Sequence, residues 1–244
     1  MTKKNMIIHD EILIFHALRH RDDQLIVEGL ARNHGRISFV VRISHAPRAK
    51  IRHTIFQPMA VLEVEWEEKP RAKLMKPLSA RVSQPWRSLH TSPIKATLTL
   101  FLAEFLMQVC RHEQSGELFF DYLLHSLTWL DTAEEGYANF HLLFLMRLAQ
   151  FLGISPNTSD TSLPFFDLMA AEFASRAPAH VYYIYGDEAR AFEQLLRMNF
   201  STMHLFRLTR VQRNRILELI LTYYRLPIPS LPELKSWEVL REFF

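Results

Sequence analysis

Cysteine and glycine are scarce in this 244-residue sequence, and each scarcity excludes a class of site. Cys110 is the single cysteine, so an intrachain disulfide or a cysteine-based zinc site cannot form. Its apolar helical surroundings predict a buried, inert thiol. The six glycines lie too far apart for a GxxxxGK phosphate loop or a GxGxxG dinucleotide loop, and no GxSxG or HExxH motif occurs. We therefore expect a protein that is not an enzyme and that carries no cofactor or metal.

Long apolar runs are also missing. No window of about 18 residues is apolar without a charge, so no membrane-spanning helix is expected. The first residues, MTKKNMIIHDEIL, lack the apolar stretch and small-residue cleavage site of a signal peptide. These features predict a cytoplasmic protein.

Acidic residues are absent between Glu28 and Glu63, a stretch that holds six Arg or Lys. Residues 1–80 contain 14 Arg and Lys against 9 Asp and Glu, whereas residues 81–244 contain 15 against 17. The positive potential therefore belongs to the first third of the chain, which favours a polyanionic partner there.

The first 80 residues have the period-two pattern of β-strands. Apolar residues alternate with the rest at Ile37, Phe39, Val41 and Ile43. A turn signal, Asn33–Gly35, precedes this run. The expected strands cover residues 11–20, 24–31, 37–44, 58–66 and 72–82. Five short strands without a helix between them are typical of a small Greek-key barrel such as the OB-fold.

The pattern changes to helical periodicity between residues 80 and 90, which predicts an α+β multidomain chain. We expect an OB-fold β-barrel over residues 1–82 and a mainly α-helical domain over residues 83–244. Ser92 and Pro93 have the residue types of an N-cap and a first helical position. The expected helices begin near residues 93, 116, 137, 187, 209 and 236. Residues 160–185 are expected to form a short irregular or hairpin insertion.

The basic residues of the first domain are the candidates for nucleic-acid binding, because each phosphate contact releases condensed counterions. They are Arg32, Arg36, Arg42, Arg48, Lys50, Arg52, Lys69, Arg71, Lys73 and Lys76. Phe56 is a candidate base-stacking partner. The alternative is a solvated loop without a ligand, and the carboxylate pair Asp22–Asp23 is expected to be a solvated turn.

Several segments resemble the RecO family of bacterial DNA repair and recombination mediators. QLIVEGLARNHGRISFVVRIS is similar to the family's strand–turn–strand, and FQPMAVLEVEW is similar to the strand that follows. LFLAEFL, ELFFDYLLHSLTWLD and NFHLLFLMRLAQFLG resemble its successive helices, and YYRLPIPSLPELKSWEVLREFF resembles a tail found in part of the family. The likeness covers nearly the whole chain.

The resemblance implies an OB-fold followed by a helical domain. It implies binding to single- and double-stranded DNA, strand annealing, remodelling of single-strand-binding protein (SSB), and loading of RecA together with RecR and sometimes RecF. It also implies a cytoplasmic protein that joins the nucleoid during repair. Many members carry a four-cysteine zinc site, but residues 165–185 contain no cysteine here, so we expect aromatic packing in its place.

In the family, the helical domain receives the acidic C-terminal tail of SSB, which ends in apolar residues. By position, the resemblance places this pocket at Arg111, Phe140, Leu143, Phe144 and Arg147. The apolar members could equally be bundle core, and the arginines could be surface charge. Two other functions stay open, namely a protein-binding scaffold without DNA affinity and an RNA-binding OB module.

Overall fold

The structure is a computed structural model, and it describes residues 6–44, 51–68, 72–110 and 116–244. The chain divides into two compact units. The first comprises Met1–Asp131 and Leu234–Val239, and the second comprises Thr132–Glu233 and Leu240–Phe244.

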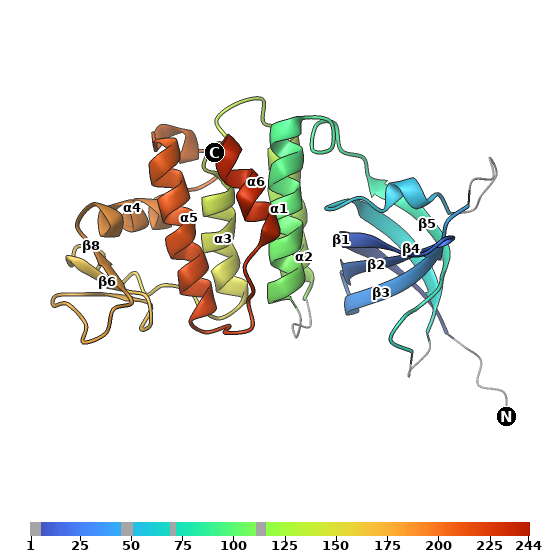
Figure 1. Cartoon of the computed structure of the whole chain (residues 1–244), viewed down its shortest axis with the longest axis horizontal. Helices are drawn as coiled ribbons and strands as arrows, with labels where there is room; N and C mark the ends of the chain where they lie inside the picture. Colours follow the sequence, from blue (N-terminus) through green and yellow to red (C-terminus); the bar gives the residue numbers. More distant parts are fainter. Residues whose placement is uncertain (1–5, 45–50, 69–71, 111–115) are drawn as a thin grey trace. The chain divides into compact units, whose positions relative to one another are not determined.

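Unit 1 is built on a five-stranded antiparallel sheet (Figure 1). Its strands are β1 (Ile7–Arg21), β2 (Gln24–Ala31), β3 (Gly35–Arg42), β4 (Val61–Glu67) and β5 (Pro77–Gln84), in the order β3-β2-β1-β4-β5. A short 3-10 helix, η1 (His53–Ile55), lies between β3 and β4. The turn between β2 and β3 closes at Gly35, whose φ of 67° favours glycine. The N-terminal fold is therefore OB-like.

The expectation of a closed barrel is corrected, because the sheet is open. Its edge strands are β3 and β5. An isolated parallel bridge between Phe39 and Met75 connects β3 to the segment before β5. Val40 N donates to Met75 O at 2.8 Å, and Met75 N donates to Ser38 O at 2.9 Å. This bridge positions the start of β5 beside β3 without continuing into a strand ladder.

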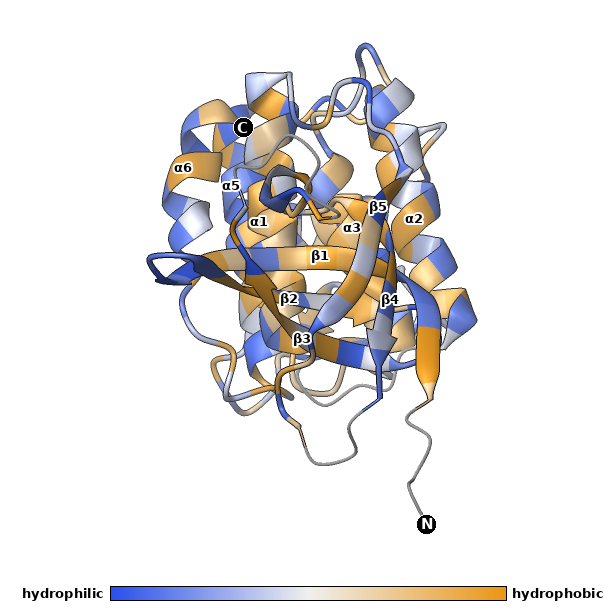
Figure 2. Ribbon diagram, turned by 90° about the vertical axis from the view of Figure 1, so that its right-hand side faces the viewer, coloured by the Kyte–Doolittle hydropathy of each residue, from blue (hydrophilic) through white to orange (hydrophobic). Residues whose placement is uncertain are grey.

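The core of the sheet follows the alternation in the sequence, which can be seen along the strands in Figure 2. Phe39 and Val41 of β3 are buried in one cluster with Trp66 of β4. Strand β1 differs, because Ile12, Leu13, Ile14 and Phe15 are all buried in succession. Helix α1 contacts β1, so both faces of this strand are covered.

Two helices follow the sheet: α1 (Pro93–Val109) and α2 (Glu117–Thr132). Ser92 is the N-cap of α1 and Pro93 is at its start, although the Ser92 side chain makes no cap hydrogen bond. The Asp131 carboxylate accepts hydrogen bonds from the backbone N–H groups of Arg87, Ser88 and Leu89, at 2.8 to 3.0 Å. These bonds outweigh the desolvation of the buried carboxyl and hold its pKa below the usual value. Asp131 thereby fixes the segment that leads from β5 into α1. Cys110 is buried as expected.

Unit 2 combines helices with a small sheet. Its elements are α3 (Phe140–Phe151), β6 (Phe165–Asp167), β7 (Glu172–Ala174), β8 (Tyr183–Tyr185), α4 (Gly186–Arg197), η2 (Met203–Leu205) and α5 (Arg210–Arg225). Helix α6 (Lys235–Phe243) ends the chain and contributes residues to both units. Thr209 and Gln212 form a capping box at the start of α5.

Strands β6 and β7 form a hairpin, and β8 adds a third strand on the other side of β6. Phe166 is fully buried, and its ring centroid lies 4.9 Å from that of Phe173 and 4.8 Å from that of Phe192. Aromatic packing thus joins this sheet to α4.

Candidate nucleic-acid interface

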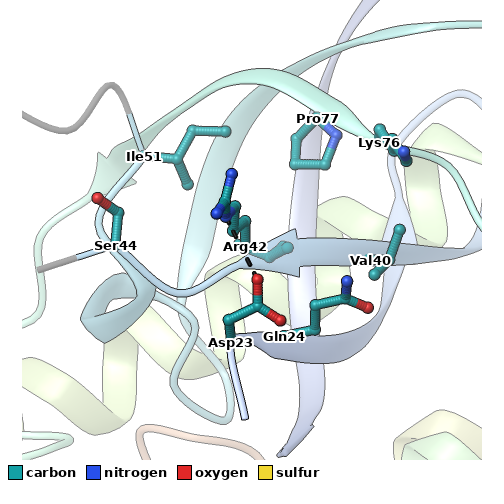
Figure 3. Close-up of a pocket in the computed structure, with 9 residues that line it drawn as sticks. Asp23, Gln24, Val40, Arg42, Ser44, Ile51, Lys76 and Pro77 are labelled. Carbon is teal, nitrogen blue, oxygen red and sulfur yellow. Dashed lines mark ion pairs between the residues drawn. The ribbon is translucent and has the colours of Figure 1, made fainter. Parts of the chain in front are cut away.

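A pocket of about 550 Å³ lies where β3 ends and β5 begins (Figure 3). Its lining comes from the β1–β2 turn, β2, β3, the segment after β3, and the start of β5. The residues are Asp23, Gln24, Val40, Val41, Arg42, Ser44, Ile51, Lys76 and Pro77. Two of the ten predicted nucleic-acid contacts, Arg42 and Lys76, therefore line one cavity.

Arg42 reaches the pocket because of its position in strand β3. Phe39 and Val41 point into the core, so the alternation places Arg42 on the opposite face. Its side chain is 84% exposed, and its Nε lies 3.4 Å from a carboxylate oxygen of Asp23. Gln24 is the direct cross-strand partner of Arg42. The arginine is therefore oriented by the sheet but remains open to a ligand.

Lys76 reaches the same pocket from the other edge of the sheet. The backbone bonds of Met75 to Ser38 and Val40 hold the segment in front of it. Pro77 then begins β5, and Lys76 itself is exposed. Two cations from segments more than 30 positions apart in the sequence thus line the same cavity.

Of the other predicted contacts, Arg52 and Lys73 are exposed. Arg52 directly follows Ile51, a pocket residue, and Lys73 belongs to the segment that carries Lys76. Four lie outside the described residues: Arg48, Lys50, Lys69 and Arg71.

Arg32 and Arg36 lie in a different environment, at the end of the sheet next to the helices. Arg32 forms ion pairs with Glu11 and Asp121, and its guanidinium lies 4.4 Å from the ring centroid of Phe120. Arg36 donates to Met107 O at 2.6 Å and to the Glu28 carboxylate at 2.5 Å. Both guanidinium groups are engaged within unit 1, so the structure does not bring them together with Arg42 and Lys76.

The expected stacking residue Phe56 is also placed elsewhere. Its side chain is 4% exposed and belongs to the hydrophobic core of the sheet. A base could not stack on this ring without opening the core. Among the described residues that line the pocket, none is aromatic, and the apolar ones are Val40, Val41, Ile51 and Pro77.

Four of the five residues predicted to receive the SSB tail lie in unit 2. Phe140, Leu143 and Phe144 are at most 1% exposed. Arg147 donates to Met198 O at 2.9 Å, and Arg111 lies outside the described residues. A peptide could reach the three apolar side chains only if their neighbours moved.

The sequence reasoning missed several residues of the pocket, among them Asp23, Gln24 and Ile51. A signal for Gln24 was present, because a turn centred on residue 33 pairs position 24 with position 42. Asp23 was interpreted as part of a solvated turn; it is an exposed turn residue, and its carboxylate also faces Arg42. Ile51 carried no such signal, since its position depends on the path of the chain after β3.

Neither a membrane-spanning helix nor a metal-binding cluster occurs in the described ranges. No helix there is long and apolar enough to cross a bilayer. The same residues contain no group of three His, Cys, Asp or Glu side chains placed to hold a metal ion.

Comparison with known proteins gives matches over almost the whole chain. The family models described as Recombination protein O N terminal and Recombination protein O C terminal match residues 6–86 and 90–238. A DNA repair protein RecO from Bacteroides fragilis (strain YCH46) is 42% identical over 234 residues, covering 95% of this chain and 97% of that protein. The DNA repair protein RecO of Phocaeicola vulgatus is 40% identical over 233 residues, with the same coverage. That of Christiangramia forsetii is 32% identical over 240 residues and is matched along its full length.

Proposed function

Because this chain belongs to the RecO family, with a role in DNA repair and recombination, we propose that it is a recombination mediator that binds single- and double-stranded DNA and anneals complementary strands. In this proposal it also helps to load the recombinase onto DNA coated with SSB. It acts by binding and not by catalysis, in the cytoplasm and at the nucleoid during repair.

The observation that carries the proposal is the convergence of Arg42 and Lys76 on one open cavity. Half or more of protein–DNA hydrogen bonds go to phosphate and sugar, which carry no sequence information, so this cationic surface suits binding that is independent of sequence. Exposed Arg52 and Lys73 extend the charge on the neighbouring segments. Neutralising the phosphates of two strands reduces their mutual repulsion, and annealing follows from that reduction.

The proposed protein partners are RecR, the C-terminal tail of SSB and, in some settings, RecF. An acidic tail that ends in apolar residues needs an apolar pocket flanked by cations. Phe140, Leu143 and Phe144 are buried. Binding of the SSB tail at these residues therefore requires α3 or its neighbours to move.

Binding of labelled oligonucleotides between about 50 and 200 mM salt tests the proposal. Affinity for both single strands and duplexes should fall steeply, by roughly 10³ if about six phosphates are contacted. A protein-binding scaffold would bind neither at any salt concentration. An RNA-binding module would prefer RNA to DNA of the same sequence.

Annealing of complementary strands that are first coated with SSB tests the second half of the proposal. The chain should accelerate annealing of coated strands, and a peptide with the sequence of the SSB tail should inhibit this in trans. Acceleration with bare strands but not with coated strands would remove SSB from the list of partners.

A further inference from the structure

The pocket at the end of β3 has more features than phosphate contact requires. Phosphates need exposed cations, and Arg42 and Lys76 supply these. The cavity also has apolar walls from Val40, Ile51 and Pro77, all half-buried. Its volume of about 550 Å³ lies within the range of small-molecule sites, which is about 300–1,000 Å³.

The polar groups inside the pocket suit a neutral ligand with hydrogen-bonding edges. The Gln24 amide lines the cavity and can both donate and accept hydrogen bonds. Asp23 contributes a carboxylate that accepts only. A second phosphate entering the cavity would be repelled by Asp23, whereas an amino group of a base could donate to it.

We propose that this pocket binds one unpaired nucleobase of a DNA strand, with the adjoining phosphates on Arg42 and Lys76. The base faces would lie against the aliphatic walls, and its edge would meet Gln24 and Asp23. Enzymes that read an extruded base use the same combination of apolar contacts and edge hydrogen bonds. This inference rests on the proposed DNA binding and goes further, because it makes the base and not only the backbone a ligand.

The base pocket gives the site a preference among DNA structures. Bases in a duplex are paired and stacked, and extruding one costs a few kcal/mol. An unpaired base in a single strand, a gap or a frayed end avoids this cost. Unit 1 therefore contacts duplex DNA through its cations alone. It contacts single strands through both the cations and the pocket.

The test compares two oligonucleotides of equal length and charge, one with normal bases and one with abasic residues throughout. The wild-type chain should bind the base-bearing strand about tenfold more tightly, the effect expected when about 55 Å² of apolar base surface is removed from water. Gln24→Ala and Ile51→Ala should lose most of this preference while keeping the affinity for the abasic strand. Arg42→Ala should weaken binding to both strands by the same factor.

Gln57→Ala is the matched control for Gln24→Ala, because Gln57 is exposed and lies outside the pocket. It should leave the preference unchanged, and thermal unfolding of each variant shows whether it is folded. Equal affinity of the wild type for the two strands would overturn the base pocket while the proposed function stands. A wild-type preference that survives in both pocket variants would also overturn it. Absence of binding to either strand would instead contradict the proposed function itself.

Discussion

The two ends of strand β3 show how differently one type of side chain can be used. Arg36 and Arg42 lie on the same face of the same strand, six residues or about 20 Å apart. Arg36 is bonded to Glu28 and to the Met107 carbonyl of α1. Arg42 is 84% exposed and lines a cavity with Lys76. One end of the strand thus uses its arginine for folding, and the other leaves it open to a ligand.

A cluster of basic residues in the sequence is therefore not yet a basic surface. Arg32 and Arg36 come from the same acid-free stretch as Arg42. Helices α1 and α2 supply a backbone carbonyl and the Asp121 carboxylate that engage the first two. The position of a cation relative to the helices, and not its place in the sequence, decides whether it stays open to a ligand.

The largest effect is expected when the open end of β3 loses its charge. Arg42→Ala combined with Lys76→Ala removes two phosphate contacts. Each contact contributes nearly a factor of ten at about 0.1 M salt, so duplex affinity should fall by roughly 60-fold. Fluorescence anisotropy measures this change. The unfolding midpoint should not change, and an unaltered affinity would place the DNA site elsewhere.

A second test concerns His141, a basic side chain that is fully withdrawn from solvent in unit 2. Its ring lies 5.1 Å from that of Phe244, and neither ring nitrogen has a hydrogen-bond partner among the described residues. Burial, together with the charge of Arg213, lowers the pKa of His141 to about 3. The unfolded state binds this proton below about pH 6.5 and the folded state does not, so stability is lost as the pH falls.

Between pH 7 and pH 5 the wild type should therefore lose about 2 kcal/mol of unfolding free energy through this group. Urea titrations of the wild type and His141→Leu at both pH values measure the difference. The unfolding free energy of His141→Leu should fall by about 2 kcal/mol less than that of the wild type between pH 7 and pH 5. Equal losses in the two proteins would show that His141 is protonated in the folded state.

A third prediction compares the same substitution at Arg32 and at Arg42, which lie at opposite ends of the sheet. Arg32→Met removes the ion pairs with Glu11 and Asp121 and the contact with Phe120. It should cost about 1 kcal/mol of unfolding free energy and change DNA affinity less than twofold. Arg42→Met is the matched variant and should show the reverse pattern. If both substitutions weakened DNA binding alike, the two ends would not be functionally distinct.

The smallest effect is expected at Asp23, whose carboxylate competes with phosphate for Arg42. Asp23→Asn keeps an acceptor oxygen but removes the charge. Affinity for DNA should rise about two- to fourfold, and the gain should shrink at high salt because exposed charges are screened. A decrease in affinity would mean that the carboxylate orients Arg42 for binding.

Much of the fold could be predicted from the sequence, because period and caps are local signals. The β2–β3 hairpin follows from the alternation of Phe39 and Val41 and from the turn at Gly35. The open sheet could not be predicted, because closure depends on how the Met75 segment meets β3. The division into domains 1–82 and 83–244 stays a prediction.

The candidate site was predictable only in part. Strand alternation pointed Arg42 away from the core, and the structure places it in the pocket. The engagement of Arg32 and Arg36 by Glu11, Asp121 and Met107 was not predictable, since it depends on contacts up to 89 positions apart in the chain. Long-range contacts of this kind leave no periodic trace in a single sequence.

The salt dependence of duplex binding measures whether Arg42 and Lys76 contact phosphates. A plot of log affinity against log salt concentration should become less steep by about 1.8 when Arg42 and Lys76 are both replaced by Ala, which corresponds to two lost phosphate contacts. The slope of Arg32→Met should equal that of the wild type. An unchanged slope in the double variant, with a reduced slope in Arg32→Met, would contradict the assignment of DNA binding to this pocket.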